Sequence, residues 1–363
     1  MSTLNVNRIA DASGGVLAPI SSVMRNRIIN GAMVIDQRNA GASVTPSADG
    51  YTLDRWNYQA SQTSKFTIQQ NKGSVTPPVG LANYLGMSVA SAVTIGSSDY
   101  FMISQYVEGF NTSDLGWGTA SAKTVTLSFQ VYSSLTGTFG GAVQNSASDR
   151  SYPFSYTISS ANTWTSISVT IAGDTSGTWI GSTNGIGVRV RFGLGIGSAL
   201  SGTAGAWNGN NNFSATGATS VVGTNGATFY ITGVQLEVGT QATGFEYRQY
   251  GQELALCQRY YQKLGLVASQ MLGFGITQTG SQGVIYCKYT TTMRASPTAT
   301  FSNLSVGDSW NYGRTVTTLA GSSFGFDSAQ LVCGIAQSDM TAQRGMSLVC
   351  GGSTSFIDFS AEL

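Results

Sequence analysis

The sequence predicts an all-β chain built of antiparallel sheets, and three observations lead to this fold class. Glycine is abundant, with 46 residues in a chain of 363, while only 10% of the residues are charged. Short apolar runs alternate with polar residues at a period of two, and turn-rich segments separate these runs. Alternation of this kind gives each strand one buried and one solvated face. We therefore predict tandem β-sandwiches, jelly-roll-like, joined by a short helix and preceded by an extended N-terminal arm.

The predicted arm, residues 1–26, is polar and too short to form a core of its own. It is interpreted either as a disordered tail or as an arm that becomes ordered against partner chains. The opening stretch, "MSTLNVNRIADASGG", lacks the apolar centre of a secretory signal. No apolar run is long enough to span a bilayer. These features predict synthesis in the cytosol of the producing cell and no membrane insertion.

The large predicted sandwich, residues 27–250, is defined by its alternating runs. The expected inward faces are Val125, Leu127, Phe129 and Val131 in "KTVTLSFQVYSS", Ile167, Val169 and Ile171 in "TSISVTI", and Ile186, Val188, Val190, Phe192, Leu194 and Ile196 in "GIGVRVRFGLGIG". In "ATFYITGVQLEVG" the alternation changes phase at Gly233, which predicts a β-bulge there. The glycines of "GIGVRVRFGLGIG" alternate within a strand and do not open a helix, so we predict no dinucleotide cofactor.

A change of period marks the predicted connector, residues 251–265. Leu254, Cys257, Tyr261 and Leu264 would form one apolar stripe on a helix, which Gly265 could end. Strand patterns then resume and predict a smaller, distal β-sandwich over residues 266–363.

The side-chain inventory limits the possible chemistry. Histidine is absent, which removes the commonest general base and metal ligand. Two carboxylates would suffice for a glycosidase, but nothing in the sequence marks such a pair, and the acidic residues are interpreted as turn caps and surface groups. No Asp-x-Asp run supports a calcium site, so no metal is predicted. The four cysteines, at positions 257, 287, 333 and 350, are interpreted as buried free thiols. The net charge of +1 gives no reason to expect nucleic-acid binding.

Three segments together resemble a family of bacteriophage tail-fibre and receptor-binding proteins. These segments are "MRNRIINGAMVIDQRNAG", "YTLDRW" and "QLEVGTQATGFEYRQYGQELALCQRYYQK", and the opening "TLNVNRIADASGG" is similar to the start of phage fibre proteins. The resemblance covers residues 1–264. It implies a virion component, a homotrimer with jelly-roll modules, whose N-terminal arm attaches to tail or baseplate proteins and whose distal domain contacts a host-surface glycan or protein. It further implies a location in the virion tail.

The candidate ligand-binding residues are aromatic and amide side chains in loops rich in glycine, serine and asparagine, because sugars stack on exposed rings. They are Trp117, Trp179, Trp207, Asn208, Trp310, Asn311 and Tyr312. Packing in the core or between protomers is the favoured interpretation of the first three tryptophans, and "GDSWNYGR" could serve either purpose.

Two motifs are interpreted as structural. Asp54, Arg55 and Trp56 of "YTLDRW" are predicted to fix the sandwich edge through a buried ion pair and a core ring. Glu246, Tyr247 and Arg248 are predicted to form a hydrogen-bonded clasp where the chain leaves the sandwich.

The sequence therefore predicts a non-enzymatic phage attachment protein that binds its receptor multivalently. Two alternatives stay open: a purely structural virion adaptor, collar or head-decoration protein, and a capsule depolymerase.

Overall fold

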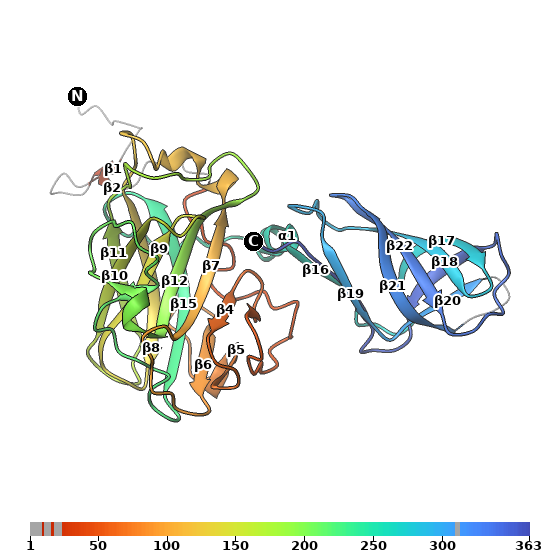
Figure 1. Cartoon of the computed structure of the whole chain (residues 1–363), viewed down its shortest axis with the longest axis horizontal. Coiled ribbons are helices and arrows are strands. Elements are labelled where there is room, and N and C mark those ends of the chain that lie inside the picture. The colour runs from red at the N-terminus through yellow and green to blue at the C-terminus, as the bar shows by residue number, and fades with distance from the viewer. Residues whose placement is uncertain (1–8, 11–15, 18–23, 309–312) are drawn as a thin grey trace. The chain divides into compact units, whose positions relative to one another are not determined.

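The computed structural model describes residues 9–10, 16–17, 24–308 and 313–363, and the chain divides into two compact units, Met1–Tyr250 and Gly251–Leu363. The regular secondary structure of both units is almost entirely strand (Figure 1), so the predicted all-β class with antiparallel sheets is confirmed. Within the predicted arm, β1 (Ile9–Ala10) pairs with β2 (Val16–Leu17) in antiparallel register.

The first unit is a sandwich of two antiparallel sheets. The six-stranded sheet has the order β10-β9-β12-β7-β4-β3, formed by β3 (Gly50–Tyr51), β4 (Asn57–Ala60), β7 (Tyr100–Glu108), β9 (Gly137–Gln144), β10 (Ser151–Ile158) and β12 (Ile186–Ile196). The five-stranded sheet has the order β11-β8-β15-β6-β5, formed by β5 (Phe66–Gln70), β6 (Leu85–Val89), β8 (Val125–Ser133), β11 (Thr165–Ile171) and β15 (Thr228–Val238). Short 3-10 turns lie in the loops, namely η1 (Lys72–Ser74), η2 (Gly109–Asn111), η3 (Ser113–Leu115) and η4 (Ser198–Leu200).

One hydrophobic core lies between the two sheets. The predicted inward faces of β8 and β12 supply much of it, and Phe129 of β8 packs edge-on against Phe192 of β12 with ring centroids 5.0 Å apart. Ile186 and Ile196, at the ends of β12, are only partly buried. Because alternate residues of each strand point into the same layer, the period-two pattern correctly located this core.

The phase change in β15 is a bulge, as predicted. The pairing of β15 with β8 shifts register between Thr232 and Gln235, and Gly233 adopts φ 61° inside this shift. Ile231 and Val234 are consequently both fully buried although they are three residues apart. Glycine suits the position because left-handed backbone disfavours residues with a Cβ atom.

Replacing Gly233 by alanine is expected to lower the free energy of unfolding by about 1–2 kcal/mol, through left-handed strain. The new Cβ atom would also lie 3.0 Å from Leu81 Cδ1. Urea denaturation would measure the loss, with Gly244→Ala as control, since a Cβ there meets nothing within 4 Å. Equal stability of the two variants would contradict this assignment.

A loop after β12 covers part of the outer face of the six-stranded sheet. It carries β13 (Ser201–Gly202) and β14 (Ser214–Ala215), which pair in parallel. Gly140 and Gly193 allow the loop to lie close to the sheet, since a Cβ atom at either position would come within 3.0 Å of the Ser214 hydroxyl. Polar residues of this sheet face are thereby removed from solvent.

The second unit is organised differently from the predicted sandwich. Six strands form a closed barrel in the order β17-β18-β22-β21-β20-β23, from β17 (Met271–Thr279), β18 (Gln282–Lys288), β20 (Leu304–Asp308), β21 (Arg314–Phe324), β22 (Ser328–Ile335) and β23 (Gly345–Cys350). A three-stranded sheet accompanies it, formed by β16 (Tyr261–Gly265), β24 (Phe356–Ser360) and β19 (Thr298–Ser302). The barrel closes because β17 pairs with both β18 and β23, which leaves that sheet without an open edge.

The predicted helix is right in its first half and wrong in its second. The α-helix α1 spans Tyr250–Gln258, whereas Tyr261 and Leu264 of the expected apolar stripe lie on β16. Pairing with β24 takes precedence there, and the aromatic pair in "RYYQKL" favours extended structure. The segment that was predicted to be a helical connector therefore contributes a strand to the second unit.

All four cysteines are buried thiols that form no disulfide with one another, as predicted. Burial raises the pKa of the Cys287 and Cys333 thiols to about 12, so both stay protonated at neutral pH. They act as small apolar groups of the barrel core.

Candidate functional site

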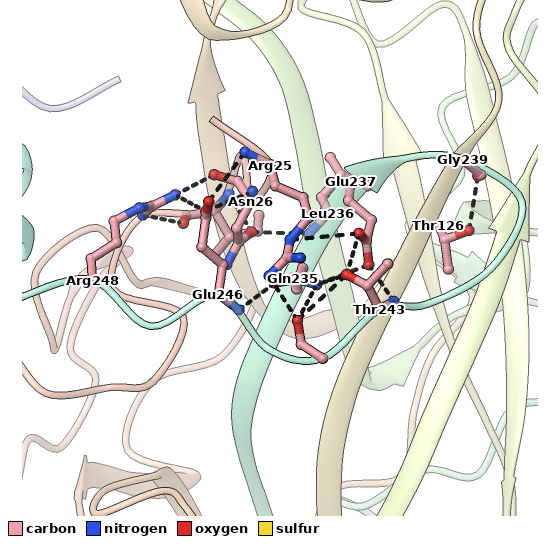
Figure 2. Close-up of polar contacts among 12 residues, drawn as sticks. Arg25, Asn26, Thr126, Gln235, Leu236, Glu237, Gly239, Thr243, Glu246 and Arg248 are labelled. Carbon is pink, nitrogen blue, oxygen red and sulfur yellow. Dashed lines mark hydrogen bonds and ion pairs between the residues drawn. The ribbon is translucent and has the colours of Figure 1, made fainter. Parts of the chain in front are cut away.

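A buried polar network explains much of the "QLEVGTQATGFEYR" segment. Glu237 of β15 is 1% exposed, and its carboxylate accepts hydrogen bonds from the Thr243 backbone N–H and hydroxyl at 2.8 and 2.7 Å. The Gln235 side-chain amide donates to the same carboxylate at 2.8 Å, and its side-chain oxygen accepts from the Glu246 N–H at 2.8 Å. Figure 2 shows these side chains joining β15 to the loop that follows it. The network fixes the path of residues 239–246.

The predicted residues Glu246 and Arg248 bind the chain where it enters the sandwich. The Glu246 carboxylate accepts the backbone N–H of Asn26 at 2.9 Å, and the Arg248 guanidinium donates to the carbonyls of Ile28 and Asn26. Glu246 and Arg248 are themselves 3.2 Å apart (Figure 2). We name this group, Asn26, Ile28, Glu246 and Arg248, the entry–exit clasp. The clasp ties the segment that enters the sandwich to the segment that leaves it.

The three residues of "YTLDRW" that were predicted to be structural lie in the core. Trp56 is 0% exposed and donates its indole N–H to the Asn30 carbonyl at 2.9 Å. Asp54 is also fully buried, with Arg38 Nε 3.7 Å from its carboxylate and the Gln37 amide donating at 2.9 Å. The Arg55 guanidinium donates to the carbonyl of Tyr106 on β7. The motif thus ties the β3–β4 turn to the six-stranded sheet.

The structure brings three predicted tryptophans together in one cluster. The ring centroids of Trp117, Trp179 and Trp207 lie 4.7–5.3 Å apart in edge-to-face contacts. Each indole N–H has an acceptor within the chain. Trp117 donates to the Lys123 carbonyl at 2.8 Å, and Trp207 donates to the Ala172 carbonyl at 2.7 Å. Trp179 donates to the Asp174 carboxylate at 3.3 Å and to the Ser176 carbonyl at 3.2 Å.

A small pocket of about 240 Å³ lies beside Trp117 and Trp179, lined by loop residues such as Thr112 and Ser182. The three rings are mostly turned against one another and pack on the sandwich core. This placement supports packing at the end of the sandwich as their role.

Of the remaining predicted ligand-binding residues, the structure describes only Asn208. The Asn208 carbonyl oxygen of the side chain accepts hydrogen bonds from the Asn210 N–H and the Asn212 amide at 2.9 Å each, so Asn208 organises its own loop. Trp310, Asn311 and Tyr312 lie outside the described residues.

A larger groove lies on the outer face of the five-stranded sheet. It has a volume of about 400 Å³, and its floor is formed by outward side chains of β8 and β11, namely Ser128, Gln130, Ser166 and Ser168. Two loops form its walls, residues 78–81 and residues 242–247. Tyr247 joins the walls by donating its hydroxyl to the Gly80 carbonyl at 2.8 Å.

The groove combines an exposed aromatic wall with a fixed polar floor. Tyr247 is 62% exposed, and its ring contacts Phe245 edge-on with centroids 5.1 Å apart. On the floor, the Gln130 amide and the Ser166 hydroxyl exchange hydrogen bonds of 2.8 and 3.0 Å, which hold the amide plane in place. No residue that lines the groove is charged. We call this surface the sheet groove.

Sequence reasoning missed the sheet groove because its parts are dispersed. The polar floor residues alternate with buried ones, so each reads as the ordinary solvated face of a strand. Tyr247 was assigned to the clasp, whereas its hydroxyl bonds to Gly80 on the opposite wall. The available signal was the pair of aromatic residues, Phe245 and Tyr247, in a loop segment rich in small and polar residues.

Asp36 and Asp99 are acidic side chains that cap turns, the role that the sequence predicts for such residues. Asp36 accepts the N–H groups of Asn39 and Gly41 at 2.9 and 2.6 Å. Asp99 accepts the Gly96 N–H at 2.8 Å and the Ser61 hydroxyl at 2.8 Å, and these bonds lower the pKa of its carboxyl group.

The described residues hold no group of three or more cysteine and acidic side chains arranged to bind a metal ion. No helix in the same part of the chain is both long and apolar enough to cross a bilayer.

The chain matches no known family of protein sequences and no curated protein. Among solved structures it is similar to the enzymatically active domain of tailspike protein 4 of bacteriophage CBA120, with 11% identity and a TM-score of 0.34 over 59% of this chain and 21% of that chain. It is also similar to the module TmCBM61 in complex with β-1,4-galactotriose (10% identity, TM-score 0.30, 59% and 99% of the chains). A third similarity is to the family 11 carbohydrate-binding module from Clostridium thermocellum in complex with a mixed-linked tetrasaccharide (12% identity, TM-score 0.27, 55% and 98%). The chain thus spans about a fifth of the tailspike domain and almost the whole of the two modules.

Proposed function

We propose that this chain is a phage attachment protein that binds an uncharged stretch of a host-surface glycan in the sheet groove without cleaving it. The observation that carries the proposal is the combination of an exposed Tyr247 ring and a fixed amide and hydroxyl floor at Gln130 and Ser166. Sugar C–H groups stack on aromatic rings, while amides and hydroxyls match sugar hydroxyl groups. The absence of charge in the groove lining favours a neutral saccharide over an acidic one.

The role in the virion is supported by the resemblance of residues 1–264 to phage tail-fibre proteins. In this proposal the chain is a homotrimer in the virion tail, and residues 1–26 attach it to tail or baseplate proteins. A single glycan site of millimolar affinity supplies only ~4 kcal/mol. Several linked copies would raise the avidity by roughly two to four powers of ten. The entry–exit clasp suits such a protein, because it would transmit force from the arm to the rigid sandwich.

We expect the purified protein to bind bacterial surface glycans on an array, and Tyr247→Ala to weaken the strongest interaction at least tenfold. Loss of a stacking ring and of its hydrogen bond to the groove wall is worth about 1.5 kcal/mol, which corresponds to a factor of ten. Gln130→Ala should weaken it by a similar factor, because the floor loses its amide. Isothermal titration calorimetry with the best array glycan would provide the constants.

The matched control is Tyr250→Ala, since Tyr250 is 65% exposed, against 62% for Tyr247, and does not line the groove. Its affinity should equal that of the unchanged protein. Failure of the unchanged protein to bind any glycan would refute glycan binding and favour the structural adaptor. Release of oligosaccharides from host capsule would instead identify a depolymerase. Immunogold labelling of intact particles would test the placement in the tail.

A further inference from the structure

Two arginines on the opposite face of the sandwich have no carboxylate partner among the residues that the structure describes. Arg189 and Arg191 point outward from β12, where they pair in register with Tyr106 and Ser104 of β7. In the part of the chain that the structure describes, no acidic side chain forms an ion pair with either of them. Both guanidinium groups lie near the face of the Tyr106 ring, at 5.4 and 5.8 Å from its centroid.

Only neutral groups hold these two cations. Arg191 donates through Nη1 to the Gln59 side-chain oxygen at 2.7 Å and lies 4.6 Å from the centre of the Phe213 ring. Arg189 donates through its own Nη1 to the Ser148 hydroxyl and to the Asn145 carbonyl at 3.3 Å. In each case one terminal nitrogen is fixed by the protein. The Nε atom of each arginine has no acceptor in the described part of the chain.

Neighbouring polar atoms on this sheet face are also unsatisfied. Asn57, Ser104 and Arg191 form one row across β4, β7 and β12. Within the described residues, the side-chain oxygen of Asn57, the Ser104 hydroxyl and Arg191 Nε are all buried without a hydrogen-bond partner. Buried polar atoms in proteins are nearly always paired, so such a row calls for an explanation such as a ligand.

Two arginines elsewhere in the sandwich, Arg25 and Arg27, also have an Nε atom without a hydrogen-bond acceptor among the described residues, but each lies beside a carboxylate. The pairs are Arg25–Glu237 at 4.0 Å and Arg27–Asp114 at 2.8 Å. The positive charge is therefore compensated at those two positions. At Arg189 and Arg191 it is not, although the two side chains lie close to each other.

The energetic consequence is largest at Arg191, which is 4% exposed. Burial, the largest cause, lowers the pKa of its guanidinium to about 10, and the nearby positive charge of Arg189 also lowers it. The group still carries its charge at neutral pH. The negative charge of Asp49 raises this pKa, but the Asp49 carboxylate already accepts hydrogen bonds from the Gln59 amide and the Ala60 N–H. A buried charge without a counter-ion is costly, so an incoming anion would relieve this cost.

We propose that Arg189, Arg191 and Ser104 form a binding site for a compact oxyanion, that is, a carboxylate, sulfate or phosphate group. A guanidinium binds such groups through two parallel N–H donors, and in both arginines the Nε edge is the one that the protein leaves unpaired. The Ser104 hydroxyl, on the residue opposite Arg191 in the strand register, can supply a neutral donor. This site lies on the six-stranded sheet, and it is independent of the neutral glycan proposed for the sheet groove.

The test is a calorimetric titration of the full chain at low ionic strength with sodium glucuronate, with inorganic phosphate, and with glucose as the neutral comparison. We expect at least one of the two anions to bind and glucose not to bind this site. Arg189→Gln and Arg191→Met should each weaken anion binding at least tenfold. The methionine keeps an apolar stem against Phe213. The control is Arg314→Gln, because Arg314 is already paired with Asp339 at 2.5 Å, and its affinity should not change.

Thermal unfolding separates this role from a merely structural one. Without anion, Arg191→Met should be at least as stable as the unchanged protein, because an uncompensated buried charge is removed. Added anion should raise the melting temperature of the unchanged protein but not that of the variant. Binding of glucuronate but not phosphate would identify a site for a sugar carboxylate. Binding of both anions would identify a general oxyanion site. The proposal is overturned if neither anion binds, or if both arginine variants bind as the unchanged protein does. Tyr247→Ala should leave anion binding intact, so failure here and failure of the groove proposal are distinguishable.

Discussion

Replacing Arg248 by methionine is expected to lower the free energy of unfolding of the first unit by about 3 kcal/mol. The substitution removes the donors to the carbonyls of Asn26 and Ile28 and leaves the Glu246 carboxylate without its cation. Both charged side chains are mostly buried, with exposed fractions of 10% and 19%. Removal of one partner from such a pair is strongly destabilising, because the other charge remains in a poorly solvated site. Urea denaturation would measure the change.

The same variant should release the entry segment locally. Arg25 and Arg27 are potential trypsin sites that the clasp holds against β15, since Arg27 N–H bonds to the Leu236 carbonyl at 2.9 Å. We expect cleavage after these residues to be at least tenfold faster in Arg248→Met than in the unchanged protein. The control is Tyr247→Phe, which loses a single exposed hydrogen bond and should be cleaved at the rate of the unchanged protein. Unchanged stability together with unchanged cleavage would show that the clasp contributes little.

The sandwich was predictable because its information is local. Val125, Leu127 and Phe129 alternate with polar residues, and the phase change at Gly233 can be read without knowledge of any partner strand. Closure of the barrel was not predictable, since it depends on β17 pairing with β23 some seventy residues away in sequence. The prediction of the second half of the helix was wrong for the same reason. Tyr261 and Leu264 fit a helical period, but pairing of their segment with β24 stabilises a strand there.

The binding surfaces were harder to predict than the fold. The sheet groove combines four segments, and serines such as Ser128 and Ser166 carry no local sign that a loop will wall them in. The arginines of "GVRVRF" were assigned correctly to the outward face of their strand. That Arg191 is nonetheless buried follows from the later loop that brings Phe213 over it. Patterns within one strand determine which way a side chain points, whereas burial of the outward face depends on distant segments.

Replacing Trp117 by alanine is expected to lower the free energy of unfolding by about 3–4 kcal/mol while leaving glycan affinity unchanged. Trp117 is 7% exposed and contacts both Trp179 and Trp207, so its removal leaves a cavity at the end of the sandwich and frees the Lys123 carbonyl.

Trp117→Phe serves as the control, because it keeps a ring in the cluster and should lose only about 1–1.5 kcal/mol. The two interpretations of the tryptophan loops then give opposite results. If the rings pack the end of the sandwich, stability falls and binding stays. If they bind sugar, the alanine variant loses glycan affinity at a temperature where it is still folded. That result would assign the glycan site to the pocket beside Trp117 and Trp179 instead of the sheet groove.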